Sequence, residues 1–251
     1  MEPLERGNVR LAATIVLLRD SPSGPEVFMM KRPGRGDFPD LHVFPGGKVD
    51  EGDFVPELLD GLTEAAADRD LGIAAGGLRY WVAAIRECFE ECGVLLAYRG
   101  GAVVRWRDEG EVARFGAYRQ RLIDGEITMS ELCRREGLRL AARRVHYFSH
   151  WVTPEAAPRR FDTRFFVAAM PEDQQTLAHR GEVADDSWVR PEDALTAGAD
   201  GRWQMISPTL TTLGSLSGYA DVSEVLEAVR EERHLPELTP ALRDQGMHPL
   251  R

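Results

Sequence analysis

The sequence has 251 residues and a mass of 28.0 kDa, which suits one large domain or one domain carrying an insertion. Apolar residues make up 43% and charged residues 29%, a composition that excludes collagen, low-complexity disorder and disulfide-rich scaffolds. The net charge of −10 makes the chain a poor general binder of nucleic acid, so a phosphate-bearing substrate would need metal ions or individually placed arginines.

Residues 13–18 and 27–30 are apolar runs separated by the turn-forming residues 21–25, which predicts a β-hairpin at the start of the fold. Residues 41–44 predict a further short strand that leads into Pro45, Gly46 and Gly47, where we expect the chain to turn sharply. No segment is typical of a membrane span or a signal peptide, because the apolar run near the start is too short and lacks a cleavage site. We therefore expect a cytoplasmic protein.

Helical patterns dominate the middle of the chain. Residues 54–72 predict one helix and residues 78–97 a second, more regular one. Residues 100–140 are rich in charge and again helical in pattern, so we expect helical insertions at about 54–77 and 100–140 rather than separate domains. The three cysteines leave one unpaired in any disulfide scheme, and we expect reduced, buried thiols.

The remaining elements alternate between the two types. Strands are predicted at residues 145–148, 161–169 and 187–189, and helices at residues 191–197 and 223–232. A single domain then covers residues 1–235, and residues 236–251 form a loosely held tail without a clear period. The order of elements favours an α+β fold with a mixed sheet over a doubly wound βαβ fold.

An acidic cluster stands on the more regular helix, where the spacing of Glu87, Glu90 and Glu91 places all three carboxylates on one face. Like charges at this spacing destabilise an isolated helix by roughly 0.2–0.5 kcal/mol per pair. A bound Mg²⁺ would explain the cluster, since carboxylate oxygens are the ligands that this ion prefers. A solvated acidic helix face is the alternative.

The surroundings of the cluster resemble the Nudix box, G-x5-E-x7-R-E-U-x-E-E-x-G-U with U apolar. Gly47 takes the place of the first glycine, Asp53 that of the first acid, and residues 86–94 the remainder. Aspartate replaces the usual glutamate, and 32 residues, 54–85, stand where the family has seven. The branch typified by peroxisomal coenzyme A diphosphatases also has an interrupted box. The chain resembles that branch further downstream, at residues 151–154, 160–166, 203 and 207–209.

This resemblance implies a Nudix fold, in which a mixed β-sheet is sandwiched between helices as an α/β/α sandwich. It implies hydrolysis of a nucleoside diphosphate linked to another moiety, by attack of water on phosphorus with Mg²⁺ or Mn²⁺. Glu87 and Glu91 would bind the metal, Glu90 would share it or polarise water, and the Gly47 carbonyl would add a ligand. Arg86 would orient the carboxylates through a charge-assisted bond.

Other site residues are expected outside the box. Glu182 is the candidate general base, with Asp185 and Asp186 competing and a solvated acidic turn as the alternative. Arg32 and Arg164 are candidates for binding the substrate, and an ion pair is the alternative role for Arg164. His146 and His150 lie four apart on a predicted strand, a spacing that does not indicate a zinc site.

The expected substrate is coenzyme A or acyl-coenzyme A. This expectation rests on the resemblance along the whole chain, because an upstream pattern of another coenzyme A branch matches only at residues 28–32 and 44–47. One alternative is an ADP-ribose or nucleotide-sugar diphosphatase, and another is a non-catalytic Nudix-fold sensor of a nucleotide metabolite. The expected partner is a small nucleotide rather than nucleic acid or a membrane. A homodimer, common in the family, is one open oligomeric state. The final residues, 249–251, are not a peroxisomal address.

Overall fold

A mixed β-sheet of eight strands lies at the centre of the chain, in a computed structural model that describes residues 5–6, 9–33, 40–157, 159–177 and 185–231. The long path of the sheet has the order β11-β3-β2-β10-β9, and β1, β4 and β5 pair with strands of this path. Strands β2 and β10 run parallel, whereas every other described pair is antiparallel. The eight strands are β1 (Glu5–Arg6), β2 (Val9–Ser21), β3 (Gly24–Lys31), β4 (His42–Val43), β5 (Gly46–Lys48), β9 (His146–Val152), β10 (Arg160–Ala169) and β11 (Asp185–Val189).

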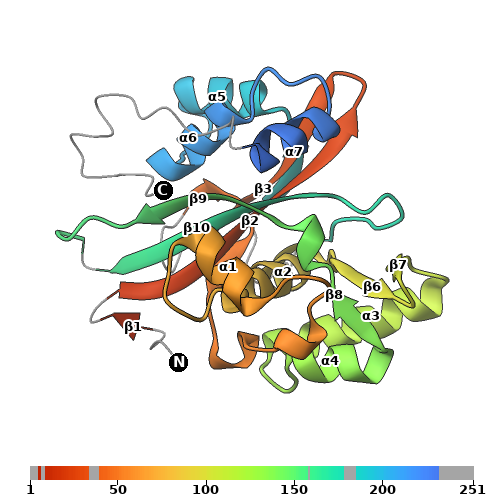
Figure 1. Cartoon of the computed structure of the whole chain (residues 1–251). Coiled ribbons are helices and arrows are strands. Elements are labelled where there is room, and N and C mark those ends of the chain that lie inside the picture. Colours follow the sequence, from red (N-terminus) through yellow and green to blue (C-terminus); the bar gives the residue numbers. More distant parts are fainter. Residues whose placement is uncertain (1–4, 7–8, 34–39, 158, 178–184, 232–251) are drawn as a thin grey trace.

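Helices cover both faces of this sheet, with α5, α6 and α7 on one side and α1 to α4 on the other (Figure 1). Their bounds are α1 (Glu64–Leu71), α2 (Leu78–Cys92), α3 (Glu109–Ile123), α4 (Met129–Glu136), α5 (Pro191–Ala199), α6 (Ser207–Ser215) and α7 (Val222–Arg230). Alternate side chains of β2 enter the two cores: Ile15 packs with the α2 side and Val16 with the α7 side. The expected α/β/α arrangement is therefore confirmed.

The strand predictions hold well. The hairpin of β2 and β3 pairs Leu18 with Val27, β10 and β11 contain their predicted residues, and β9 contains its predicted residues except Val145 and runs on to Val152. At Pro45, only a bend separates β4 from β5. Gly46 and Gly47 do not adopt the left-handed conformation, and they form β5 on β2 instead of a sharp turn. The prediction of a sharp turn was wrong, because these glycines are needed for space rather than for backbone freedom.

Helix α2 ends five residues earlier than predicted. Gly93 adopts a left-handed φ of 74° and its N–H donates to the carbonyl of Phe89, which closes the helix. The apolar residues that follow, Val94, Leu95 and Leu96, are buried outside the helix. They extend the apolar pattern without extending the helix, and for that reason the sequence alone overestimates its length.

The predicted helix at residues 54–72 is also shorter than expected. Only α1 is α-helical there, and η2 (Pro56–Leu58) is a 3₁₀ turn; a second 3₁₀ turn, η1 (Glu51–Asp53), precedes this range. Thr63 caps the start of α1 by accepting a hydrogen bond from the N–H of Ala66. Val55 and Leu59 are buried although they lie outside the helix, so their spacing imitates a helical period.

The second insertion contains more than helices. Its helices α3 and α4 are confirmed, but residues before and after them form a separate three-stranded sheet in the order β7-β6-β8. The strands are β6 (Ala97–Arg99), β7 (Ala102–Val103) and β8 (Leu138–Leu140), and η3 (Ala142–Arg144) follows them.

Helix α6 was not predicted either, and the predicted tail lies outside the described residues. All three cysteines are free and buried, as expected. None of the described helices combines the length and the apolar character that a membrane span requires.

Candidate active site

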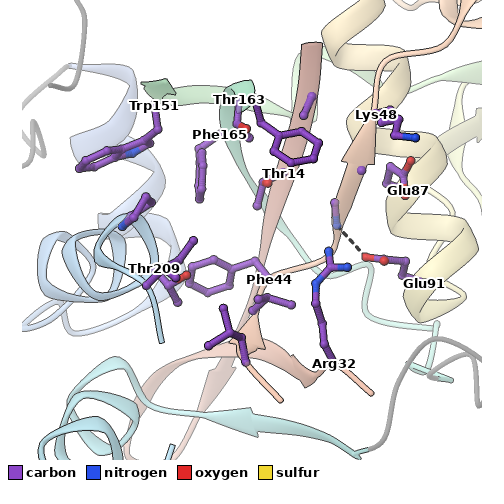
Figure 2. A pocket seen from close by; sticks show the side chains of 18 of the residues that line it. Thr14, Arg32, Phe44, Lys48, Glu87, Glu91, Trp151, Thr163, Phe165 and Thr209 are labelled. Carbon is purple, nitrogen blue, oxygen red and sulfur yellow. Dashed lines mark hydrogen bonds between the residues drawn. The ribbon is translucent and has the colours of Figure 1, made fainter. Parts of the chain in front are cut away.

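A cavity of about 1140 Å³ lies on the face of the sheet that α6 covers, and adjacent strands form its floor (Figure 2). The pairing register aligns Trp151 of β9, Thr163 of β10, Ala12 of β2 and Lys48 of β5 in one row. Side chains at paired positions share one face of a sheet, so this row crosses the cavity from β9 to β5.

Arg86 joins the acidic residues at the β5 end of the cavity. Its Nε and Nη2 donate to the two carboxylate oxygens of Asp53 at 2.9 and 3.0 Å. Its Nη1 donates to Glu87 at 2.7 Å and to Glu90 at 3.0 Å, and its Nη2 also donates to the carbonyl of Lys48. Asp53 and Arg86 are therefore adjacent despite the inserted segment between them. A bidentate pair of this kind fixes the guanidinium plane as well as its position.

Burial shapes the protonation of this cluster. Burial raises the pKa of Glu87 to about 7; the charge of Arg86 opposes that shift, and the negative charge of Glu90 adds to it. Burial likewise raises the pKa of Asp53, against the hydrogen bonds from Arg86. A buried carboxylate with a raised pKa gains from a nearby cation, which favours its charged form.

The two glycines of β5 allow this strand to approach β2 on one side and helix α2 on the other. The N–H of Gly46 donates to Glu91 at 2.7 Å, as the dashed line in Figure 2 shows. A Cβ atom on Gly47 would lie 2.6 Å from the Cδ of Glu87, and one on Gly46 would lie 2.7 Å from the hydroxyl oxygen of Thr14. Only glycine fits at both positions.

Two cations line the cavity at the same end. Arg32 and Lys48 both lie on its wall, and within the described ranges neither side chain has a carboxylate partner. Figure 2 shows them at the end of the cavity that holds Glu87 and Glu91. They are therefore available to an anionic ligand.

Arg164 does not reach the cavity. It lies on the opposite face of β10 from Thr163, its side chain is buried, and its Nε lies 3.7 Å from the Asp162 carboxylate. Its guanidinium also lies 5.8 Å from the centre of the Tyr80 ring. The structure thus places Arg164 in a core ion pair, the alternative role that the sequence left open.

None of the described candidates for a general base lies in the cavity wall. Glu182 lies outside the described residues. Asp185 and Asp186 begin β11, where they pair with Lys31 and Met30 of β3, and neither lines the cavity. His150 lies 2.6 Å from Asp162 on the buried side of β9, in a pairing unrelated to a zinc site.

The acidic residues fit a divalent cation in their chemistry, because Glu87, Glu90 and Glu91 offer oxygen ligands on one cavity wall. Across the described ranges, however, no three acidic, histidine or cysteine side chains already converge as a metal site. The reason lies in the contacts above: Arg86 binds Glu87 and Glu90, and Gly46 binds Glu91. A cation would share or replace these contacts.

Sequence reasoning missed most of the cavity floor. Thr163 and Phe165 were known only as residues of a predicted strand and of a segment that resembles the family, Trp151 only as part of such a segment, and Lys48 only as one of two lysines among 31 basic residues. Their convergence depends on pairing between distant strands. The one available signal was the alternation of Phe161, Thr163 and Phe165 on a single strand face.

Comparison with known proteins gives consistent matches. The family described as NUDT19 Nudix domain matches residues 70–215. The acyl-coenzyme A diphosphatase NUDT19 of Gallus gallus is 30% identical over 233 residues, which cover 76% of this chain and 62% of the relative. The putative nudix hydrolase 7 of Caenorhabditis elegans is 24% identical over 84% of this chain and 62% of the relative. The chain thus spans 62% of the length of these curated relatives.

A solved structure agrees with these matches. A NUDIX hydrolase from Alicyclobacillus acidocaldarius superposes with a TM-score of 0.72 and 27% identity. The match covers 87% of this chain and 96% of the other. The similarity in structure therefore extends over most of the chain.

Proposed function

The chain belongs to the Nudix hydrolases, within the NUDT19 Nudix domain family, and from this premise we propose that it is a metal-dependent diphosphatase of coenzyme A or acyl-coenzyme A. The products would be 3',5'-ADP and a phosphopantetheine. The observation that carries the proposal is that Glu87 and Glu91 lie at the same end of the cavity as two cations. These cations, Arg32 and Lys48, have no carboxylate partner among the described residues. Carboxylates for a metal and cations for a phosphate are the two requirements of diphosphate hydrolysis.

The carboxylates have distinct roles in this proposal. Glu87, Glu90 and Glu91, with the carbonyl of Gly47, would hold Mg²⁺ or Mn²⁺. When bound, such an ion neutralises phosphate charge and lowers the pKa of the attacking water. Arg86 would position Glu87 and Glu90 through the hydrogen bonds that it already makes.

The cations would hold the substrate. Arg32 can bind two oxygens of one phosphate through its planar guanidinium, and Lys48 adds a point charge from β5. Both act against the net charge of −10, which repels an anionic substrate at long range. The assignment of the general base to Glu182 stays a prediction.

The test is product analysis of the purified protein with coenzyme A, acetyl-coenzyme A, ADP-ribose and NADH, with Mg²⁺ or Mn²⁺ in turn. We expect the two coenzyme A compounds to be cleaved fastest and the Glu91→Gln variant to lose this cleavage. Faster cleavage of ADP-ribose would make the chain a nucleotide-sugar type of diphosphatase. Binding without cleavage of any compound would refute the enzyme proposal and favour a metabolite sensor.

A further inference from the structure

The cavity has a second end whose chemistry differs from that of the carboxylates. We define the aromatic end as the part lined by Phe44, Trp151, Phe161 and Phe165, which Figure 2 shows in part, across the cavity from Glu87 and Glu91. Phe44, Trp151 and Phe165 are at most 6% exposed, so their remaining accessible surface faces the cavity. The hydrolysis of a diphosphate does not itself use these rings.

The distance between the two ends follows from the register of the strands. Trp151 and Lys48 occupy the ends of one row that crosses β9, β10, β2 and β5. Three steps of about 4.8 Å between neighbouring strands give a separation of about 14 Å. In a nucleoside diphosphate the ribose joins the base to the first phosphate, so one such molecule can place its base at the aromatic end and its diphosphate at the carboxylate end.

The polar atoms of the aromatic end narrow the choice of group. Thr163 and Thr209 line the cavity there, and Thr14 lies between Phe165 of β10 and Gly46 of β5. Across the described residues none of these three hydroxyls has a hydrogen-bond partner. The indole N–H of Trp151 already donates to Ser149 at 3.1 Å, so this residue offers its ring alone. The wall thus combines aromatic faces with three free hydroxyl groups.

An acyl chain and a nucleobase would use this wall differently. An acyl chain would displace water from the hydroxyls without replacing its hydrogen bonds, which is unfavourable. A purine offers an aromatic face to the rings, and ring nitrogens and an amino group to the threonines. We propose that the aromatic end is the subsite for the purine base of the substrate, with Thr163 and Phe165 as specificity-determining residues. This inference rests on the proposed function only in placing the diphosphate at the carboxylate end.

Binding of AMP tests the subsite without requiring hydrolysis. We expect AMP without metal to quench tryptophan fluorescence through Trp151 and to bind more tightly than ribose 5-phosphate, which lacks the base. Loss of the aromatic face in Phe165→Leu should weaken AMP binding by about 5- to 20-fold, within the range known for base stacking. Loss of one hydroxyl in Thr163→Val should weaken it by about 2- to 10-fold.

Controls separate recognition from folding. Binding of ribose 5-phosphate should be unchanged in both variants, and Phe54→Leu, which alters a ring that is 40% exposed outside the cavity, should leave AMP binding unchanged. If Phe165→Leu does not fold, the nearly isosteric Thr163→Val decides the question.

Two results would overturn the inference: equal affinity for AMP and ribose 5-phosphate, or variants that bind AMP normally but change the preference for acyl-chain length. A protein that binds AMP as expected but hydrolyses no coenzyme A compound would keep the subsite and lose the proposed function. Hydrolysis of coenzyme A without base recognition would have the opposite meaning. The two proposals can therefore fail separately.

Discussion

The two ends of the cavity are held in place by different means. At the carboxylate end, Arg86 binds Asp53, Glu87 and Glu90, and Gly46 binds Glu91. At the aromatic end, rings are held by packing in the sheet and three threonine hydroxyls have no partner among the described residues. Groups that are already bound keep a fixed geometry, whereas free groups can adapt to a ligand. Changes to the bound groups of the first end should therefore impair chemistry and stability, whereas changes to groups without a partner, at either end, should impair affinity.

The largest expected effect is on activity, from Glu91→Gln. The substitution keeps the shape of the side chain but removes the charge that faces the cavity beside Gly46. Since loss of the outer partners of a metal ligand typically costs 10- to 100-fold, loss of a ligand should reduce kcat/KM by more than about 100-fold. Steady-state kinetics with Mg²⁺ measure this loss, and Glu109→Gln, at an exposed position on α3, is the matched control. Equal losses in both variants would contradict the assignment.

Removing the central cation should affect both properties. Arg86→Met leaves Asp53 buried without its partner, and breaking a buried pair in this way costs about 3–5 kcal/mol. We expect urea unfolding to show this decrease in the free energy of unfolding, and kcat/KM to fall by about 10- to 100-fold. A variant with full stability and low activity would show that Arg86 acts on the substrate rather than on the carboxylates.

Gly47→Ala tests the close approach of β5 and α2. The added methyl group would displace the Glu87 carboxylate, so metal affinity should fall, and overpacking should reduce stability by about 1–3 kcal/mol. Isothermal titration with Mn²⁺ and thermal unfolding measure the two effects. Gly116→Ala on α3, where a Cβ atom would meet open space, should bind Mn²⁺ normally and keep or gain stability. Normal Mn²⁺ binding by Gly47→Ala would exclude Glu87 as a ligand.

The smallest expected effect belongs to Lys48→Gln. The Lys48 side chain is exposed at the rim of the cavity, where charges act weakly and are screened by salt. We expect KM to rise by a few-fold with little change in kcat or stability, and the difference from the wild type to shrink above about 0.5 M salt. A decrease in kcat alone would instead place the ammonium group at the reacting phosphate.

Local patterns in the sequence predicted the elements that lie within one segment. The hairpin of β2 and β3, the strands β9 and β10 and the helix α2 have clear periods or turn residues, and their predictions are confirmed apart from the end of α2. The weak strand β5 lacked any such signal, since Gly46 and Gly47 have low strand propensity. It forms because β2 offers it a paired edge, which is a tertiary effect.

The two ends of the cavity also differ in whether a local sequence pattern predicts them. The acidic residues of α2 and their partner Asp53 stand in a recognisable motif, so the sequence located the carboxylate end. The aromatic end depends on the pairing of Trp151 with Thr163 and of Thr163 with Ala12, which joins segments far apart in the sequence. Arg164 was a candidate for binding the substrate, but it lies one residue from Thr163 on β10 and therefore points to the core instead of the cavity. The sequence alone did not show which face of the strand would line the cavity.

The ion pair between Asp53 and Arg86 also determines how much extra chain the motif can contain. Because these residues meet directly, the segment between them is a closed loop, and the entropy of closing a loop grows only with the logarithm of its length. Lengthening such a loop from seven to 32 residues should cost about 1.3 kcal/mol, since the rise follows 1.5RT ln(32/7). The buried side chains of Val55, Leu59 and Leu71 can offset this amount. The interrupted motif can therefore gain, lose or exchange its inserted segment at small thermodynamic expense.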